Sequence, residues 1–214
     1  MKKFAFFIAT WLCFATSPAQ QIIEKHLSFS GKENLNLNVQ IADSIDIQTW
    51  NKDEVYLKAS VIINENKDNE AYLISFNETG NTVEVKANFK KDYFKGKDGC
   101  CCESDIRWKL MVPEKTPFSL ETINGNITIA GDTRGMNVKS ISGFIDLAVP
   151  ETRQANVEFS TISGTVYSNH ALVLKEMNKS SHSIIKEQLN NGGPLIKLET
   201  ISGDIFFRKS ITNK

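Results

Sequence analysis

The stretch Leu-Glu-Thr-Ile-Asn-Gly-Asn-Ile at residues 120–127 decides the fold, because three close copies of it recur in the same chain. The copies are Val-Lys-Ser-Ile-Ser-Gly-Phe-Ile at 138–145, Phe-Ser-Thr-Ile-Ser-Gly-Thr-Val at 159–166 and Leu-Glu-Thr-Ile-Ser-Gly-Asp-Ile at 198–205. Apolar residues alternate with polar ones on both sides of each glycine. This spacing predicts two strands that meet at a tight corner, each with one apolar face.

Each predicted corner consists of a glycine and the short polar residue before it. Glycine can take a positive φ, which costs a residue with a side chain roughly 1–2 kcal/mol. The polar side chain can hydrogen-bond the backbone of the turn. We therefore assign structural roles in turns to Gly125, Gly143, Gly164, Gly203, Asn124, Ser142, Ser163 and Ser202.

One corner unit alone should not fold. Ordering about 20 residues costs roughly 20–40 kcal/mol of backbone entropy, and about five buried aliphatic side chains return roughly 8–15 kcal/mol. Stacked units would pair their backbones and share one core, so we predict a single-stranded β-helix-like β-solenoid of stacked Ile-Ser/Asn-Gly corner repeats. The alternative is a β-sandwich whose hairpins resemble one another.

The spacing of the repeats is irregular near the end of the chain. The four glycines lie 18, 21 and 39 residues apart, and the last interval is close to twice the others. Residues 168–194 are therefore either a degenerate coil or a loop insertion, and the sequence leaves both open. Within them, residues 184–189 could hold a short helical turn.

Alternating apolar residues also fill the chain before the repeats. Strands are predicted over 35–50, 55–63, 72–76, 83–89 and 106–112, with a hairpin turn at 78–81. We expect an N-terminal β-rich region at 20–113, continuous with a repeat region at 114–209, and a short tail at 210–214. The predicted fold class is all-β.

The first nineteen residues have the pattern of a secretory signal peptide. Lys2 and Lys3 precede an apolar run over 4–15, and the small residues Ser17 and Ala19 follow. The run is about a dozen residues long, whereas a membrane span needs about 20. We therefore predict a signal peptide at 1–19, no transmembrane segment after its cleavage, and a periplasmic, outer-membrane-associated or extracellular location.

Composition narrows the range of partners. The chain has 214 residues, 41% of them hydrophobic, and a formal net charge of zero. This length and composition allow a substantial core. The charge balance gives no sign of a basic face, so no nucleic-acid partner is expected.

The repeats at 120–127, 138–145 and 198–205, together with Asn-Gly-Gly-Pro at 191–194, resemble the "putative adhesin" family of exported bacterial β-solenoid proteins. The segment at 45–55 is similar to the N-terminal part of that family. The resemblance covers roughly residues 30–209. It implies a β-solenoid and an envelope or surface location, and it carries over no catalytic residue. The name of the family rests on fold, so it supports adhesion only by association.

Three consecutive cysteines, Cys100, Cys101 and Cys102, leave an odd number after the leader. Adjacent Cα atoms lie about 3.8 Å apart, closer than the roughly 4.4–6.8 Å of a disulfide. Three readings stay open. The cluster could form an intermolecular or strained local disulfide, giving a disulfide-linked dimer; it could be an exposed turn with reduced thiols; or it could bind a metal together with His26, His170 or His182. The last lacks the paired Cys-x-x-Cys spacing of zinc sites.

Acidic residues near the corners are the main candidates for catalysis. Glu121, Glu199, Asp146 and Asp204 fall at outward positions, as the carboxylates of a polysaccharide-cleaving enzyme or a calcium site would. The matching positions in other copies hold Lys139, Ser160, Phe144 and Thr165, so no acidic ladder is maintained. We therefore expect no enzyme, no catalytic residue, no metal and no cofactor.

Three aromatic residues fall on the outward parity of the repeats: Phe144, Tyr167 and Phe206. We predict that they line one outer face of adjacent units as a contact face for a partner, a glycan or a protein. The alternative is scattered surface hydrophobes without a role. The function predicted is an adhesin-like, non-enzymatic binding or structural module. The alternatives are a short β-helix carbohydrate-active enzyme and a periplasmic partner of a membrane regulator.

Overall fold

The computed structural model describes residues 20–95, 103–172 and 183–210. Within these ranges the chain forms one 15-stranded sheet and one short 3₁₀-helix, η1 (Asn69–Ala71). The strands are β1 (Gln21–Ser28), β2 (Asn34–Val39), β3 (Ile41–Trp50), β4 (Glu54–Ile63), β5 (Tyr72–Thr79), β6 (Thr82–Phe89), β7 (Ser104–Pro113), β8 (Phe118–Ala130), β9 (Met136–Ser142), β10 (Ile145–Val149), β11 (Ala155–Ser163), β12 (Val166–Ser168), β13 (Ser183–Leu189), β14 (Leu195–Ser202) and β15 (Ile205–Lys209).

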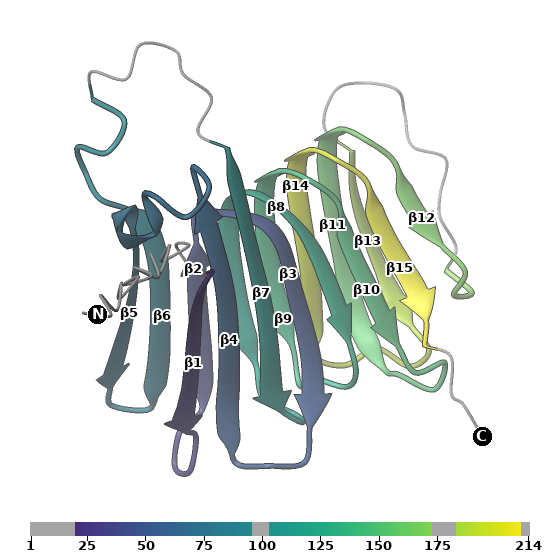
Figure 1. Cartoon of the computed structure of the whole chain (residues 1–214). Coiled ribbons are helices and arrows are strands. Elements are labelled where there is room, and N and C mark those ends of the chain that lie inside the picture. Colours follow the sequence, from purple (N-terminus) through teal and green to yellow (C-terminus); the bar gives the residue numbers. More distant parts are fainter. Residues whose placement is uncertain (1–19, 96–102, 173–182, 211–214) are drawn as a thin grey trace, which may run out of the picture.

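The sheet folds back on itself into two layers, which Figure 1 shows one behind the other. The pairings give the first layer the order β1-β4-β7-β3-β8-β10-β15-β12 and the second layer the order β5-β6-β2-β8-β9-β14-β11-β13. β8 belongs to both layers. Its first half pairs with β2 and β9, and its second half pairs with β3 and β10. The corner after Ile123 therefore joins the two layers.

Parallel and antiparallel pairs occupy different parts of the sheet. The corner units pair in parallel, as in β8 with β9, β9 with β14 and β14 with β11. The antiparallel pairs are β1 with β4, β4 with β7, β5 with β6, and β11 with β13. The described chain is all-β, as the alternation of apolar residues predicts. β2 and β3 both pair with β8, so a single sheet runs through the N-terminal region and the repeats.

The core lies between the two layers and is formed by the inward residue of each alternating pair. Trp108, Phe159 and Phe207 are its largest fully buried side chains. Trp108 donates from Nε1 to the hydroxyl of Tyr72 at 3.3 Å, and this hydroxyl donates to the backbone oxygen of Ile41 at 2.9 Å. The polar ends of both aromatic rings are thus satisfied inside the core, and burial raises the pKa of Tyr72.

The predicted β-solenoid is wrong. In a solenoid each coil stacks on the next coil along the chain, so spatial order follows sequence order. Here the last unit, β14 and β15, lies between the second and the third, because β14 pairs with both β9 and β11. The antiparallel strands at both ends complete a mixed sheet. Repetition in the sequence specifies similar units, but it does not specify their order in space.

The described part of residues 168–194 does not form a further parallel coil. It contains β13, which pairs antiparallel with β11 from Ala155↔Leu189 to Thr161↔Ser183. The helical turn considered for residues 184–189 is wrong, because these residues belong to β13. Apolar Ile185 and Leu189 point into the core, and pairing with β11 satisfies the backbone that a helix would have satisfied internally.

Close approach of backbones explains the glycines at the corners. A Cβ on Gly143 would lie 2.4 Å from the backbone oxygen of Gly125, and one on Gly203 would lie 2.1 Å from that of Gly143. A Cβ on Gly164 would lie 2.0 Å from the oxygen of Gly203. Gly143 also has a φ of +110°. The corners therefore require glycine mainly because the next unit's backbone occupies the space of a side chain.

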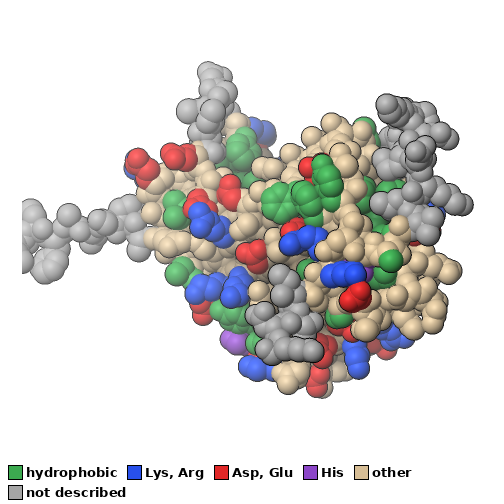
Figure 2. Space-filling model, turned by 90° about the vertical axis from the view of Figure 1, so that its right-hand side faces the viewer, with side chains coloured by type: hydrophobic (Ala, Val, Ile, Leu, Met, Phe, Trp, Pro, Cys, Tyr) green, Lys and Arg blue, Asp and Glu red, His purple; other side chains and the backbone are tan. Residues whose placement is uncertain are grey.

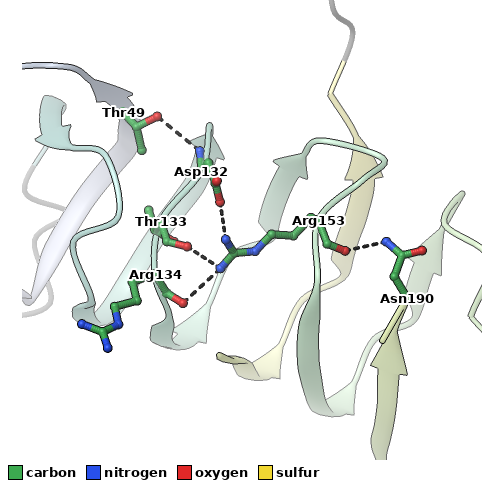
Figure 3. Close-up of polar contacts among 6 residues, drawn as sticks. All are labelled: Thr49, Asp132, Thr133, Arg134, Arg153 and Asn190. Carbon is green, nitrogen blue, oxygen red and sulfur yellow. Dashed lines mark hydrogen bonds and ion pairs between the residues drawn. The ribbon is translucent and has the colours of Figure 1, made fainter. Parts of the chain in front are cut away.

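Arg153 joins the loops at the other end of the corner units (Figure 3). Its guanidinium donates to Asp132, to the backbone oxygen of Thr133 and, at 3.0 Å, to that of Arg134. Its own backbone oxygen accepts from Asn190 at 2.6 Å. One residue of the β10–β11 loop thus contacts the β8–β9 loop through its side chain and the β13–β14 loop through its backbone.

Candidate functional site

Four isoleucines, one from each corner unit, form an exposed row on the outer face of the second layer. We call Ile123, Ile141, Ile201 and Ile162 the isoleucine row. Their exposed fractions are 46%, 47%, 46% and 50% in this spatial order. Residues on either side of each isoleucine pair in register, such as Thr200↔Ser140 and Ser202↔Ser142. The four side chains therefore stand at one level across neighbouring strands.

The position before each isoleucine fixes its outward direction. Thr122, Ser140, Thr200 and Thr161 at that position are buried polar residues. Their hydroxyls bond nearby backbone oxygens, as in Ser140 to Ser142 at 2.9 Å and Thr161 to Gly203 at 3.1 Å. Because successive side chains of a strand point to opposite faces, an inward hydroxyl at one position places the isoleucine outward at the next.

A groove of about 590 Å³ lies over the isoleucine row. We call its four isoleucines the floor and the outward residues two positions earlier the wall: Glu121, Lys139, Glu199 and Ser160. The lining also includes Thr122, Ser140 and Thr200 between floor and wall, and Asn38 and Gln40 at the end near β2 and β3. The floor is apolar and the wall is polar. The groove therefore suits a ligand with an extended apolar part.

Ion pairs hold the charged wall in place. Lys139 Nζ lies 3.5 Å from Glu199 Oε2, and Lys197 lies 2.9 Å from Glu199 and 3.3 Å from Glu158. Glu158 also pairs with Lys186 at 3.0 Å. The hydrogen bond from Lys186 lowers the pKa of Glu158 below its ordinary value. Glu158 and Glu199 therefore act as partners of lysines on the surface of the sheet.

Three aromatic side chains contact one another on the outer face of the first layer. We call Phe144, Phe206 and Tyr167 the aromatic cluster. The Phe144 and Phe206 ring centroids lie 6.1 Å apart at 81°, and those of Tyr167 and Phe206 lie 5.2 Å apart at 10°. Tyr167 is 49% exposed, while Phe144 and Phe206 are half-buried. Register places Tyr167 beside Phe206 on paired strands β12 and β15.

The carboxylates near the aromatic cluster already have partners. Arg208 Nε and Nη2 donate to the two oxygens of Asp146, at 2.7 and 2.5 Å. The hydrogen bond to Asp146 raises the pKa of Arg208. Asp204 Oδ1 accepts from the backbone N–H of Thr165 at 2.8 Å. Asp146 and Asp204 therefore support the surface, and they lie on the other layer from Glu121 and Glu199.

The end of the molecule that carries β12 and β13 combines apolar and charged side chains (Figure 2). Figure 2 shows apolar side chains gathered there, with Lys, Arg, Asp and Glu side chains of both signs around them. Ile184 on β13 is 52% exposed and pairs with Ser160, so it adds an apolar side chain beside this wall residue. Such mixtures of apolar and charged surface are typical of sites that bind partners.

Other predicted residues are placed as follows. The eight turn residues lie at the corners between the layers, where Ser142 and Ser202 pair in register. Cys100, Cys101, Cys102 and His182 fall outside the described residues. His170 is buried and stacks on Phe207 at 4.6 Å, whereas His26 is exposed beside Glu54. In the described ranges no three His, Cys, Asp or Glu side chains converge to hold a metal, and no helix there could span a membrane.

The isoleucine row was missed by sequence reasoning as a surface feature. Its signal was present, because isoleucine recurs two residues before every corner glycine. The polar Thr or Ser between two apolar positions obscured the parity, since a buried hydroxyl breaks the apolar alternation that marks the inward face.

Comparison with known proteins shows a shared fold. No family model and no curated protein matches the chain. Among solved structures, it is similar to "a putative cell adhesion protein" from Clostridium sporogenes, with a TM-score of 0.55 and 16% identity over 90% of this chain and 100% of that chain. "A putative adhesin" from Bacteroides fragilis matches at a TM-score of 0.35 and 12% identity, over 90% and 99% of the two chains. The likeness in fold rests on the first of these.

Proposed function

We propose that this chain is an exported, non-enzymatic, adhesin-like binding module of the cell envelope, and that the aromatic cluster is its contact face. The aromatic cluster carries the proposal, because three aromatic rings gather on the outer face where polar side chains would serve solubility better. Tyrosine and phenylalanine bring large contact area at low entropic cost, which makes them frequent anchors of interfaces.

The edge position of Tyr167 supports this role. β12 pairs with β15, and in the described part of the chain no strand pairs with its other edge. The ring of Tyr167 stacks one face on Phe206, and Tyr167 remains 49% exposed. A sugar ring or a partner's side chain can stack on the exposed part of this ring.

Export is supported by the pattern of residues 1–19, and the solved structure with the same fold bears a name that refers to cell adhesion. The enzyme alternative would require carboxylates converging on one face. Glu121 and Glu199 lie on the second layer and Asp146 and Asp204 on the first, and Asp146 is bonded to Arg208. We expect no sugar release from a polysaccharide panel.

The location is tested by protease treatment of intact cells that produce the chain, with a periplasmic protein as control. Cleavage of the chain while the control survives is expected. Protection until the outer barrier is broken would contradict a surface adhesin and would favour a periplasmic partner of a membrane regulator.

The contact face is tested on a glycan array and on immobilised matrix proteins. We expect Tyr167→Ala, and more strongly Phe144→Ala combined with Phe206→Ala and Tyr167→Ala, to abolish the binding seen with the unchanged chain. Phe94→Ala is the matched control, because Phe94 is 51% exposed and lies elsewhere. Unchanged binding by the folded triple variant would overturn the assignment of this face.

A further inference from the structure

We propose that the groove over the isoleucine row binds the alkyl chain of a single-chain amphiphile such as a free fatty acid. The groove is separate from the aromatic cluster, which lies on the outer face of the other layer. Its volume of about 590 Å³ falls in the range of roughly 300–1,000 Å³ that small-molecule sites occupy. The inference therefore does not depend on the proposed adhesin-like function.

The floor of the groove offers no hydrogen bond to a ligand. The hydroxyls beneath it bond the protein backbone, as Thr122 does to Asn124 at 3.1 Å and Ser140 to Ser142 at 2.9 Å. What remains exposed on the floor are the side chains of the isoleucine row. A ligand without polar groups in its middle part fits this floor, since it leaves no polar group of its own unsatisfied.

The strands beneath the groove cannot accept another strand. β9 pairs with β8 and β14, and β11 pairs with β14 and β13. Both edges of each of these strands are thus occupied, which excludes the backbone pairing by which sheets commonly bind peptides.

The spacing of the isoleucine row also disfavours an extended peptide. Neighbouring strands lie about 4.8 Å apart, so the isoleucines repeat at that interval across the sheet. Side chains on one face of an extended peptide repeat at about 6.8 Å and would fall out of step along the row. An alkyl chain has no bulky repeat and can contact every isoleucine.

The size of the apolar surface argues against a second protein as the occupant. Four side chains, each about half exposed, offer an apolar patch within the few hundred Å² that a monomer commonly shows. A stable protein interface needs about 800 Å² on each partner. The wall carries charges of both signs, Glu121 and Glu199 with Lys139, so it offers no basic patch for docking on an anionic membrane surface.

Binding can be measured by the fluorescence of cis-parinaric acid mixed with the purified exported chain. We expect saturable binding that palmitate and laurate displace and that butyrate, which is too short to reach along the row, does not. Ile141→Thr combined with Ile201→Thr should weaken binding about tenfold, because it removes apolar contacts from the floor. Threonine keeps a strand-forming residue at both positions.

Leu73→Thr is the control, since Leu73 is 46% exposed and lies on β5, at the far end of the second layer. The affinity of the Leu73→Thr chain for cis-parinaric acid should equal that of the unchanged chain. The triple alanine variant of the aromatic cluster should also bind this probe normally. Equal affinity of the double isoleucine variant and the unchanged chain would overturn the proposal. So would sedimentation with phosphatidylcholine vesicles without binding of free fatty acid, or dimer formation that depends on the isoleucine row.

Discussion

Gly143 shows how a single position can carry the stacking of two units. Its φ of +110° disfavours a side chain, and a Cβ there would lie 2.4 Å from the backbone oxygen of Gly125. The Gly125 oxygen belongs to backbone that is held in the sheet, so moving it away would cost hydrogen bonds. Strain and overlap therefore act together at this residue.

We expect Gly143→Ala to lower the free energy of unfolding by about 3 kcal/mol, measured in urea. Gly31→Ala separates the two causes, because Gly31 has a φ of +73° but no atom within 4 Å of its added Cβ. It should cost about 1–2 kcal/mol. Equal losses for the two variants would show that close approach contributes nothing at the corner.

His170 gives the fold a dependence on pH. It is buried and stacks on Phe207, and within the described part of the chain its Nε2 has no hydrogen-bond partner. Burial lowers the pKa of His170, with a further lowering by Lys209, while a hydrogen bond with the Arg208 backbone and the charge of Glu151 oppose the shift.

The unfolded chain, with a histidine pKa of about 6.5, therefore binds a proton more readily than the folded chain. Stability should be highest above that pH and should fall as the pH drops through it toward the lower folded pKa. Urea unfolding at several pH values should show this slope, and His170→Gln should reduce it. His26→Gln, at an exposed site, should leave it in place; an unchanged slope in His170→Gln would contradict the role of burial.

At the scale of elements, the sequence predicts strands well where inward residues are uniformly apolar. β4 is an example, with Val55, Leu57 and Ala59 all fully buried. It predicts poorly where a strand depends on distant pairing. β13 contains a residue pattern compatible with a helical turn, and only its antiparallel partner β11 makes it a strand. The aromatic cluster could be anticipated from parity, but contact among its rings depends on β15 lying between β10 and β12.

The loops between the elements depend on Arg153. Its side chain is 11% exposed and satisfies the backbone oxygens of Thr133 and Arg134. Arg153→Ala should lower the free energy of unfolding by about 2–3 kcal/mol, because it leaves these groups without their donor.

Hydrogen exchange should also become faster in the β8–β9 loop of the Arg153→Ala chain. Arg107→Ala is a suitable control: Arg107 forms an ion pair with Asp105, but its side chain is 66% exposed, so solvent and salt screen the pair. Comparable destabilisation by the two substitutions would mean that the network in Figure 3 adds no more than a surface ion pair.

At the scale of the whole molecule, the order of the corner units separates this fold from a solenoid. The unit nearest the C-terminus, β14 and β15, fills the interior of the sheet between β9 and β11 and between β10 and β12. The other units therefore cannot complete their pairing until the end of the chain is in place. Most contacts join residues far apart in sequence, which favours slow, cooperative folding.

A chain that ends before Leu195 should consequently fail to fold, as judged by the loss of a cooperative transition in thermal unfolding followed by circular dichroism. In a solenoid the same truncation would remove a terminal coil, and the rest would unfold cooperatively with a proportionally smaller dependence on denaturant. Here the truncation would leave β9 and β11 without their common partner β14. It would also remove Phe207 of β15, which contacts Phe159 in the core. A truncated chain that still unfolds in one sharp transition would contradict this expectation. The first three corner units would then be able to pair β9 with β11 directly, and the interior position of β14 would not be the cause of cooperative unfolding.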